Sequence, residues 1–251
     1  MFVDTDSIVR KIWGRSDTVL FIFAGAAAEF AVNKAVDWLY FTGRLPADPL
    51  GRLFSTVSYS RQILFSKYDD ALKAIDGITA IHKGVEKSRG TSIPDWAYLD
   101  VLFLLIDYSI RSFEALERKL SYAEKKEIFS VFQRVGERMN LNGLPVDYED
   151  YLIMRGRNLQ QNLVSSNFTA DLYVQYKKHL GYIRFLILKQ VQLLLAPADV
   201  KKLLPLGRIC WIRPVLAAYK MLRALKAESF FKNALLPNAY KLQIQSIDHE
   251  G

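Results

Sequence analysis

Cysteine is almost absent from the 251-residue chain, and histidine is scarce. The single cysteine, Cys210, excludes an internal disulfide framework and any zinc or iron–sulfur site that one chain builds from cysteine. Three histidines, His82, His179 and His249, make a histidine-rich metal site difficult to build. Low cysteine usage fits a reducing compartment, and we therefore expect a cytoplasmic protein.

Three common catalytic motifs are missing as well. The chain has no His-Glu-x-x-His sequence, no glycine-rich phosphate loop and no Gly-x-Ser-x-Gly elbow. The zinc proteases, the common nucleotide-binding proteins and the serine hydrolases therefore lose the signatures by which they are usually found.

Long apolar runs are also lacking. The most apolar early stretch, "VLFIFAGAAAEFAV", is interrupted by Glu29 and followed by Asn33 and Lys34, whereas a spanning helix needs about 20 apolar residues. We expect a buried helix here. The segment "MFVDTDSIVRKIWGRSD" carries acids before its first bases and has no small-residue cleavage site, so we expect no secretory signal.

Positive charge is present in excess, and most of it is C-terminal. The formal charge is +8, and residues 199–232 carry eight Lys or Arg against two acids. Aromatic residues are interleaved with these bases, so the region 199–240 is either membrane-facing, against anionic lipid, or an ordinary solvated basic face. No nucleic-acid-binding module accompanies the charge, and we expect no nucleic-acid partner.

Helical spacing of apolar residues recurs along the chain, without sustained alternation of the β type. We predict an all-α protein, one globular domain over residues 1–251, with eight or more helices around a central apolar helix and a cofactor pocket. No linker of low complexity divides the chain. The helices are expected at residues 17–42, 47–65, 68–88, 96–119, 122–139, 147–164, 168–195 and 210–227.

The central segment "LDVLFLLIDYSIRSFEAL" is apolar on nearly every side, and its polar exceptions form one stripe. Asp100, Asp107, Arg111 and Glu114 recur at spacings of seven, four and three. Arg111 is therefore expected to pair with both Asp107 and Glu114, which would neutralise charges that are costly to bury. A structural buttress is the favoured interpretation, and a carboxylate that serves chemistry in a pocket is the alternative.

His82 differs from the other two histidines because it lies on the apolar stripe of residues 68–88. Such a histidine is commonly a hydrogen-bonded core residue, but a buried neutral imidazole is also the usual proximal ligand of haem iron. In "GRLFSTVSYS", the polar side chains of Arg52, Thr56 and Tyr59 share one helix face. Arg52 and Arg61 could neutralise haem propionates, and Thr56 could donate a hydrogen bond.

These residues occur in a sequence that resembles a bacterial and fungal oxygenase family. It contains the rubber oxygenases (latex-clearing proteins) and the membrane-bound oxygenase of the mycophenolic acid pathway. The resemblance spans residues 20–240 and is carried by "LPADPLGRLFST", "AIHKGV", "DYSIRSFEALERKL", "LPVDYEDYL" and "ALLPNAYK". It lies in the order and spacing of Asp48-Pro49, Arg52, Thr56, His82, Asp107, Arg111 and Glu114.

The resemblance implies an all-α fold and a haem b cofactor. It makes His82 the iron ligand, and it places Arg52 and Thr56 in the haem pocket. The chain also departs from the family pattern. Ser55 stands where rubber oxygenases have a distal lysine, Leu102 stands where many members have a second histidine, and Asn33-Lys34 replaces a His-Pro. For a distal carboxylate only Asp37 and Glu29 lie at suitable places, and neither is assigned.

Three functions remain open from the sequence. The first is a haem-dependent oxygenase or peroxygenase that uses dioxygen or peroxide on a small apolar or lipid-like substrate. The second is a non-catalytic binder of haem or of a hydrophobic ligand. The third is a helical interaction protein without a cofactor, in which His82 is a core residue. Surplus aromatic residues add a homodimer as a candidate assembly, with peripheral membrane contact as a further expectation.

Overall fold

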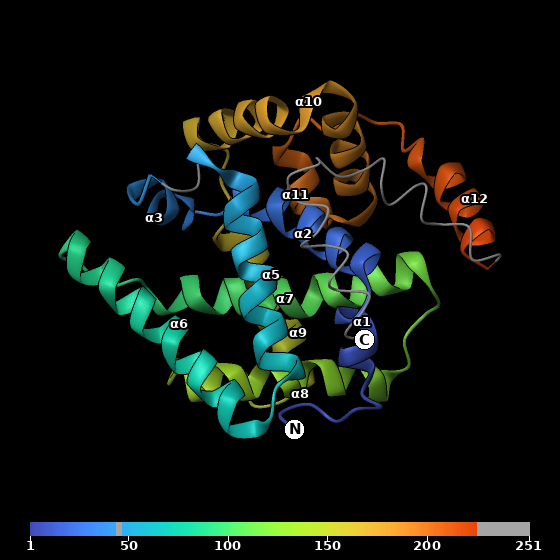
Figure 1. Ribbon diagram of the computed structural model, residues 1–251. Coiled ribbons are helices and arrows are strands. Elements are labelled where there is room, and N and C mark those ends of the chain that lie inside the picture. The colour runs from blue at the N-terminus through green and yellow to red at the C-terminus, as the bar shows by residue number, and fades with distance from the viewer. Residues whose placement is uncertain (44–46, 225–251) are drawn as a thin grey trace.

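The computed structural model describes residues 1–43 and 47–224, and over these residues the chain forms helices and no strand (Figure 1). The prediction of an all-α protein is confirmed. The elements are α1 (Ile8–Trp13), α2 (Ser16–Ala31), α3 (Val36–Phe41), α5 (Pro49–Phe65), α6 (Tyr68–Arg89), α7 (Asp95–Leu116), α8 (Tyr122–Arg138), α9 (Tyr148–Gln161), α10 (Asn167–Leu195), α11 (Ala198–Leu203) and α12 (Ile212–Ala224).

Helix α7 is the central helix that the sequence predicts. Thirteen of its 22 residues are buried, because apolar side chains cover almost all of its circumference. It packs against α1, α2, α8, α9 and α10. The apolar α2 lies along it, so the stretch read as a buried helix is buried. No helix within residues 1–43 and 47–224 is long and apolar enough to cross a membrane.

The expected helix 17–42 is wrong as a single element, since it is divided into α2 and α3. The division falls at Asn33, whose side-chain oxygen accepts from the Ala35 backbone N–H at 2.8 Å, while Lys34 N–H donates to the Asn162 carbonyl. An asparagine side chain competes well for backbone groups and favours such a break. The short helices α1 and α11 lie outside the predicted ranges.

Two apolar clusters form the core. The larger is built from α1, α2, α5 to α9 and the end of α10, and it includes Phe103 and Tyr108. The smaller joins the end of α2 to α3, α10 and α11 around Leu172 and Val200. The helix boundaries are set by local chemistry. Asp48 caps α5, with Pro49 in its first turn, and Gly90 ends α6 at a left-handed φ of 72°.

Helices α5 and α6 are joined by a short connection at Ser66 and diverge from it (Figure 1). The N-terminal turns of α5 and the C-terminal turns of α6 therefore lie at the open end of this pair. The predicted membrane-facing region 199–240 is described as far as residue 224. Its remainder, His249 and the "ALLPNAYK" segment lie outside the described residues.

Candidate functional site

His82 lies on α6 near the open end of the α5–α6 pair, where the first turns of α7 pack beside it. Its ring meets the ring of Tyr98 edge-on, with the ring centroids 5.2 Å apart. The Nδ1 atom is buried and has no hydrogen-bond partner among the described residues. A core histidine normally has both ring nitrogens satisfied, so this orphaned nitrogen sets His82 apart from the ordinary buried histidine.

Burial lowers the pKa of His82, and the positive charge of Arg52 lowers it further, while Glu86 opposes both effects in part. The imidazole is therefore neutral at pH 7. A neutral imidazole with a nitrogen that lacks a partner is chemically able to bind a metal.

Arg52 and Thr56 stand one turn apart on α5, and they contact each other as their spacing predicts. Arg52 Nη1 donates to Thr56 Oγ1 at 3.0 Å, and the Thr56 hydroxyl donates to the Arg52 carbonyl at 3.2 Å. Both residues are half-buried. The positive charge of Arg52 also acts on the imidazole of His82, which lies on the neighbouring helix α6.

A hydrogen-bonded cluster fixes the wall beside His82, and the sequence interpretation missed it. Glu86, one turn beyond His82, accepts from the Ile93 N–H at 2.8 Å and from the Tyr98 hydroxyl at 3.2 Å. Burial raises the pKa of Tyr98, and the charge of Glu86 adds to this, so the phenol stays protonated. Glu86 thereby ties the end of α6 to the start of α7 and holds the Tyr98 ring against His82.

Asp37, a candidate distal carboxylate, is engaged elsewhere. Arg89 Nη2 lies 2.7 Å from its carboxylate, and the Arg89 guanidinium stacks 4.0 Å from the ring centroid of Trp38. The pair attaches α3 to the end of α6, which is a structural task.

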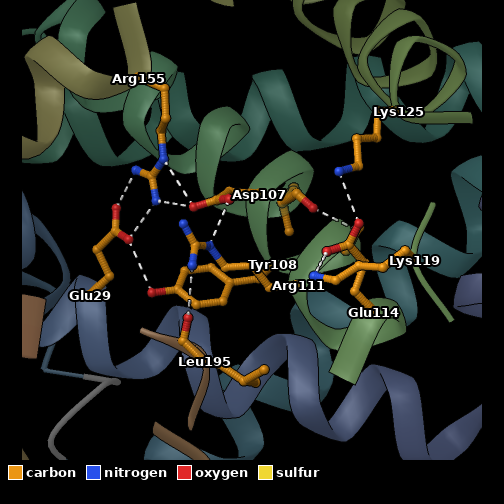
Figure 2. A network of polar contacts seen from close by, with 11 residues as sticks. Glu29, Asp107, Tyr108, Arg111, Glu114, Lys119, Lys125, Arg155 and Leu195 are labelled. Carbon is orange, nitrogen blue, oxygen red and sulfur yellow. Dashed lines mark hydrogen bonds and ion pairs between the residues drawn. The ribbon is translucent and has the colours of Figure 1, made fainter. Parts of the chain in front are cut away.

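Glu29, the other candidate, belongs to a buried network of charges shown in Figure 2. We use "buried network" for Glu29, Asp107, Arg111 and Arg155. Arg155 on α9 donates to both Glu29 oxygens at 2.5 and 2.6 Å and to Asp107 at 2.9 Å. Arg111 donates to the other Asp107 oxygen at 2.8 Å and to the Leu195 carbonyl at 3.3 Å.

The buried network balances its own charges. Two carboxylates meet two guanidinium groups, and Tyr108 donates a further bond to Glu29 at 3.1 Å. Burial raises the pKa of Glu29, and the contact with Arg155 opposes this rise. The network joins α2, α7, α9 and α10, and its carboxylates are occupied by donors. This agrees with the buttress interpretation of the polar stripe.

A comparison with known families gives the chain its assignment. The model of the family described as "ER-bound oxygenase mpaB/B'/Rubber oxygenase, catalytic domain" matches residues 10–227. The chain belongs to this family. No curated protein and no solved structure matches the chain. The resemblance read from the residues is thus confirmed, and with it the broad class of an oxygenase catalytic domain.

Within this oxygenase domain, the polar stripe of α7 is only partly as predicted. The Arg111–Asp107 pair is present at 2.8 Å, but the expected pairing of Arg111 with Glu114 is wrong. Glu114 instead contacts Lys119 at 2.8 Å and Lys125 at 2.9 Å. Lys119 lies in the α7–α8 connection and Lys125 lies on α8. The spacing of residues within α7 therefore does not predict these contacts.

Asp100 of the oxygenase domain lies apart from the other members of the stripe, among amides. Its carboxylate accepts from the side chains of Asn33 at 2.7 Å, Asn158 at 2.7 Å and Asn162 at 2.9 Å. Burial raises the pKa of Asp100, and the three amide donors oppose the rise. Asp100 thus connects the α2–α3 break to the end of α9 through hydrogen bonds.

Arg155 is the main residue that sequence reasoning overlooked in this oxygenase domain. Only 5% of it is exposed, and burying an unpaired guanidinium is costly. Its sequence position, four residues after Tyr151, does not distinguish it from an exposed arginine. No group of three His, Cys, Asp or Glu side chains suited to a metal ion occurs in the described residues.

Proposed function

We propose that this family member is a haem b-dependent oxygenase or peroxygenase that acts on a small apolar or lipid-like substrate with dioxygen or peroxide. The observation that supports the proposal is the neutral imidazole of His82, with a buried nitrogen that lacks a hydrogen-bond partner. The family assignment supports the oxygenase class.

The residues around His82 are of the chemical types that would hold a haem. His82 would hold the iron, and Arg52, whose charge acts at this position, would pair with a propionate. Thr56 fixes the Arg52 side chain through the 3.0 Å bond, and Tyr98 offers an aromatic wall beside the imidazole. Bound haem would supply the activation of dioxygen or peroxide.

The chain's own residues would orient and shield the site. Glu86 and Tyr98 hold one face of the His82 ring, which limits rotation of the imidazole. Ser55, where rubber oxygenases carry a lysine, is exposed, and its hydroxyl donates to the Gly51 carbonyl at 2.9 Å. We therefore propose no role for Ser55 in holding the haem.

A second candidate, a haem-binding protein without catalysis, is favoured by one specific observation. The carboxylates of Glu29 and Asp100, which are buried, and of the half-buried Asp107 are all bound by arginine or amide donors. An acid or base that works in catalysis must exchange protons, and these groups are held in fixed pairs. Turnover of dioxygen or peroxide by the loaded protein would separate this candidate from the first.

An absorption spectrum of the protein produced with a haem supply tests the proposal, before and after dithionite. We expect a Soret band at one haem per chain, lost in His82→Ala and kept in His179→Ala, a matched control from α10. Arg52→Ala should keep the band but release haem faster to an acceptor protein. A folded, colourless protein that takes up no hemin, or full haem occupancy in His82→Ala, would contradict the assignment.

A further inference from the structure

Helix α10 bends sharply at Gly181, where the backbone leaves the helical region at φ 74° and ψ 171°. In Figure 1 this helix runs along one edge of the molecule, on the side away from α8. Glycine is the residue that takes this conformation without strain. The bend changes the direction of α10 at the molecular periphery and presents the side chains around it to solvent.

Apolar side chains are exposed on both sides of this bend. The exposed fractions are 61% for Val174, 64% for Tyr182, 73% for Ile183 and 37% for Leu186. Single exposed apolar residues are normal, but these four lie within thirteen residues of one helix, on both sides of its bend. We call these four residues, with Lys177 and Lys178, the α10 elbow.

The charged residues of the elbow's own segment have one sign. No acidic residue occurs between Asp171 and Asp199, whereas Lys177, Lys178, Arg184 and Lys189 lie in that interval. Lys177 and Lys178 are exposed, and the Lys177 ammonium lies 5.9 Å from the centroid of the Tyr182 ring. Basic groups therefore flank the apolar side chains directly.

We propose that the α10 elbow docks on the surface of an anionic lipid bilayer. Apolar side chains that project beside lysines can enter the boundary between headgroups and acyl chains while the ammonium groups meet lipid phosphates. Tyrosine, with an apolar ring and a polar hydroxyl, is suited to that boundary. A second copy of the chain fits less well, because a two-fold contact would place these lysines opposite each other with no acid from residues 172–198 between them.

The elbow also has a defined relation to the His82 region. Helix α10 packs against α5, the helix that carries Arg52 and Thr56. If the proposed function holds, docking would place the oxygenase site beside a bilayer, in which apolar substrates dissolve. The docking itself is independent of haem and can be tested without it.

Flotation with lipid vesicles tests the proposal on the full-length protein. We expect binding to phosphatidylcholine vesicles that contain about one-third phosphatidylserine, and little binding to phosphatidylcholine alone. Lys177→Gln with Lys178→Gln should weaken binding roughly 25-fold, because each cation near an anionic surface contributes about a fivefold factor. The matched control, Lys73→Gln with Lys126→Gln, removes the same charge from α6 and α8 and should change binding less than about twofold.

A fluorescent probe tests the apolar part of the surface. Ile183→Cys, labelled with an environment-sensitive dye in a Cys210→Ser background, should brighten and shift to the blue when anionic vesicles are added. The control Val146→Cys, at a position 85% exposed between α8 and α9, should not respond.

Three results would overturn the proposal: no flotation with anionic vesicles, equal loss of binding in the two lysine pairs, or a silent probe at position 183. Light scattering that shows a dimer dissolved by Ile183→Asn would instead assign the elbow to contact between copies. If the elbow binds an acidic protein and not lipid, the protein should not float with the vesicles.

Discussion

Replacement of Arg155 by methionine removes the central cation of the buried network. The Arg155 side chain is 6% exposed and lies between Glu29, 2% exposed, and Asp107. Methionine keeps much of the side-chain volume but offers no donor. Glu29 would retain only the Tyr108 hydroxyl, and Asp107 would retain only Arg111. A buried carboxylate without its counter-ion is then left in the core.

The expected cost is about 3–5 kcal/mol of the free energy of unfolding, the range for breaking one side of a buried ion pair. An exposed pair of the same chemistry provides the control. Arg138 contacts Asp76 through two bonds of 2.8 and 2.6 Å, but their side chains are 43% and 51% exposed. Arg138→Met should therefore cost much less than Arg155→Met, because solvent screens an exposed pair. The difference between the two variants reports burial together with the second carboxylate that Arg155 binds, since both arginines make a two-bond contact with one carboxylate.

Urea unfolding followed by circular dichroism at pH 7.5 measures both variants. Glu29→Gln in the Arg155→Met background removes the buried charge that has lost its counter-ion. This second change should recover at least about 1 kcal/mol of the free energy of unfolding. Acid should also rescue Arg155→Met. Burial raises the folded pKa of Glu29, and loss of Arg155 removes the opposing effect. The folded variant then binds more protons than its unfolded chain does. Its free energy of unfolding therefore falls as the pH rises from the unfolded pKa of Glu29 towards the folded pKa of Glu29. A loss below about 1 kcal/mol, or equal losses at pH 5 and pH 7.5, would refute the buttress interpretation.

Three further predictions concern other positions in the core. A Cβ on Gly25 would lie 2.3 Å from the buried Tyr108 ring. Gly25→Ala should therefore lower the free energy of unfolding by about 1–3 kcal/mol, although alanine has the better helix propensity. The control Gly77→Ala, in open space on α6, should be stabilising in the same urea unfolding experiment. Because the folded pKa of His82 is lowered, apoprotein stability should fall as pH drops below 6.5 by up to about 1.4 kcal/mol per pH unit, and His82→Gln should flatten this slope. Asp100→Asn replaces an acceptor oxygen by an amide donor, which would face the asparagine side chains that donate to Asp100. The loss of these bonds should lower the free energy of unfolding in urea by about 1–3 kcal/mol.

The helices were largely predictable because apolar periodicity carries them. Residues 47–65, 68–88 and 122–139 were placed to within a few residues of α5, α6 and α8. The break between α2 and α3 was not predicted. It depends on the contacts of Asn33 with Asp100 on α7 and with Leu163 just after α9, and a local pattern holds no information about partners that are distant in sequence.

The same distinction explains which parts of the site were found. Arg52 and Thr56 share one helix face, so their contact follows from a spacing of four, and His82 was found because a lone histidine on an apolar stripe is conspicuous. Arg155 has no such signal. An arginine in an amphipathic helix is ordinarily exposed, and this one is buried because α2 and α7 supply two carboxylates from positions 126 and 48 residues away. A buried charge can be predicted from sequence only when its pairing partner is known. That partner is determined by the fold and not by local spacing.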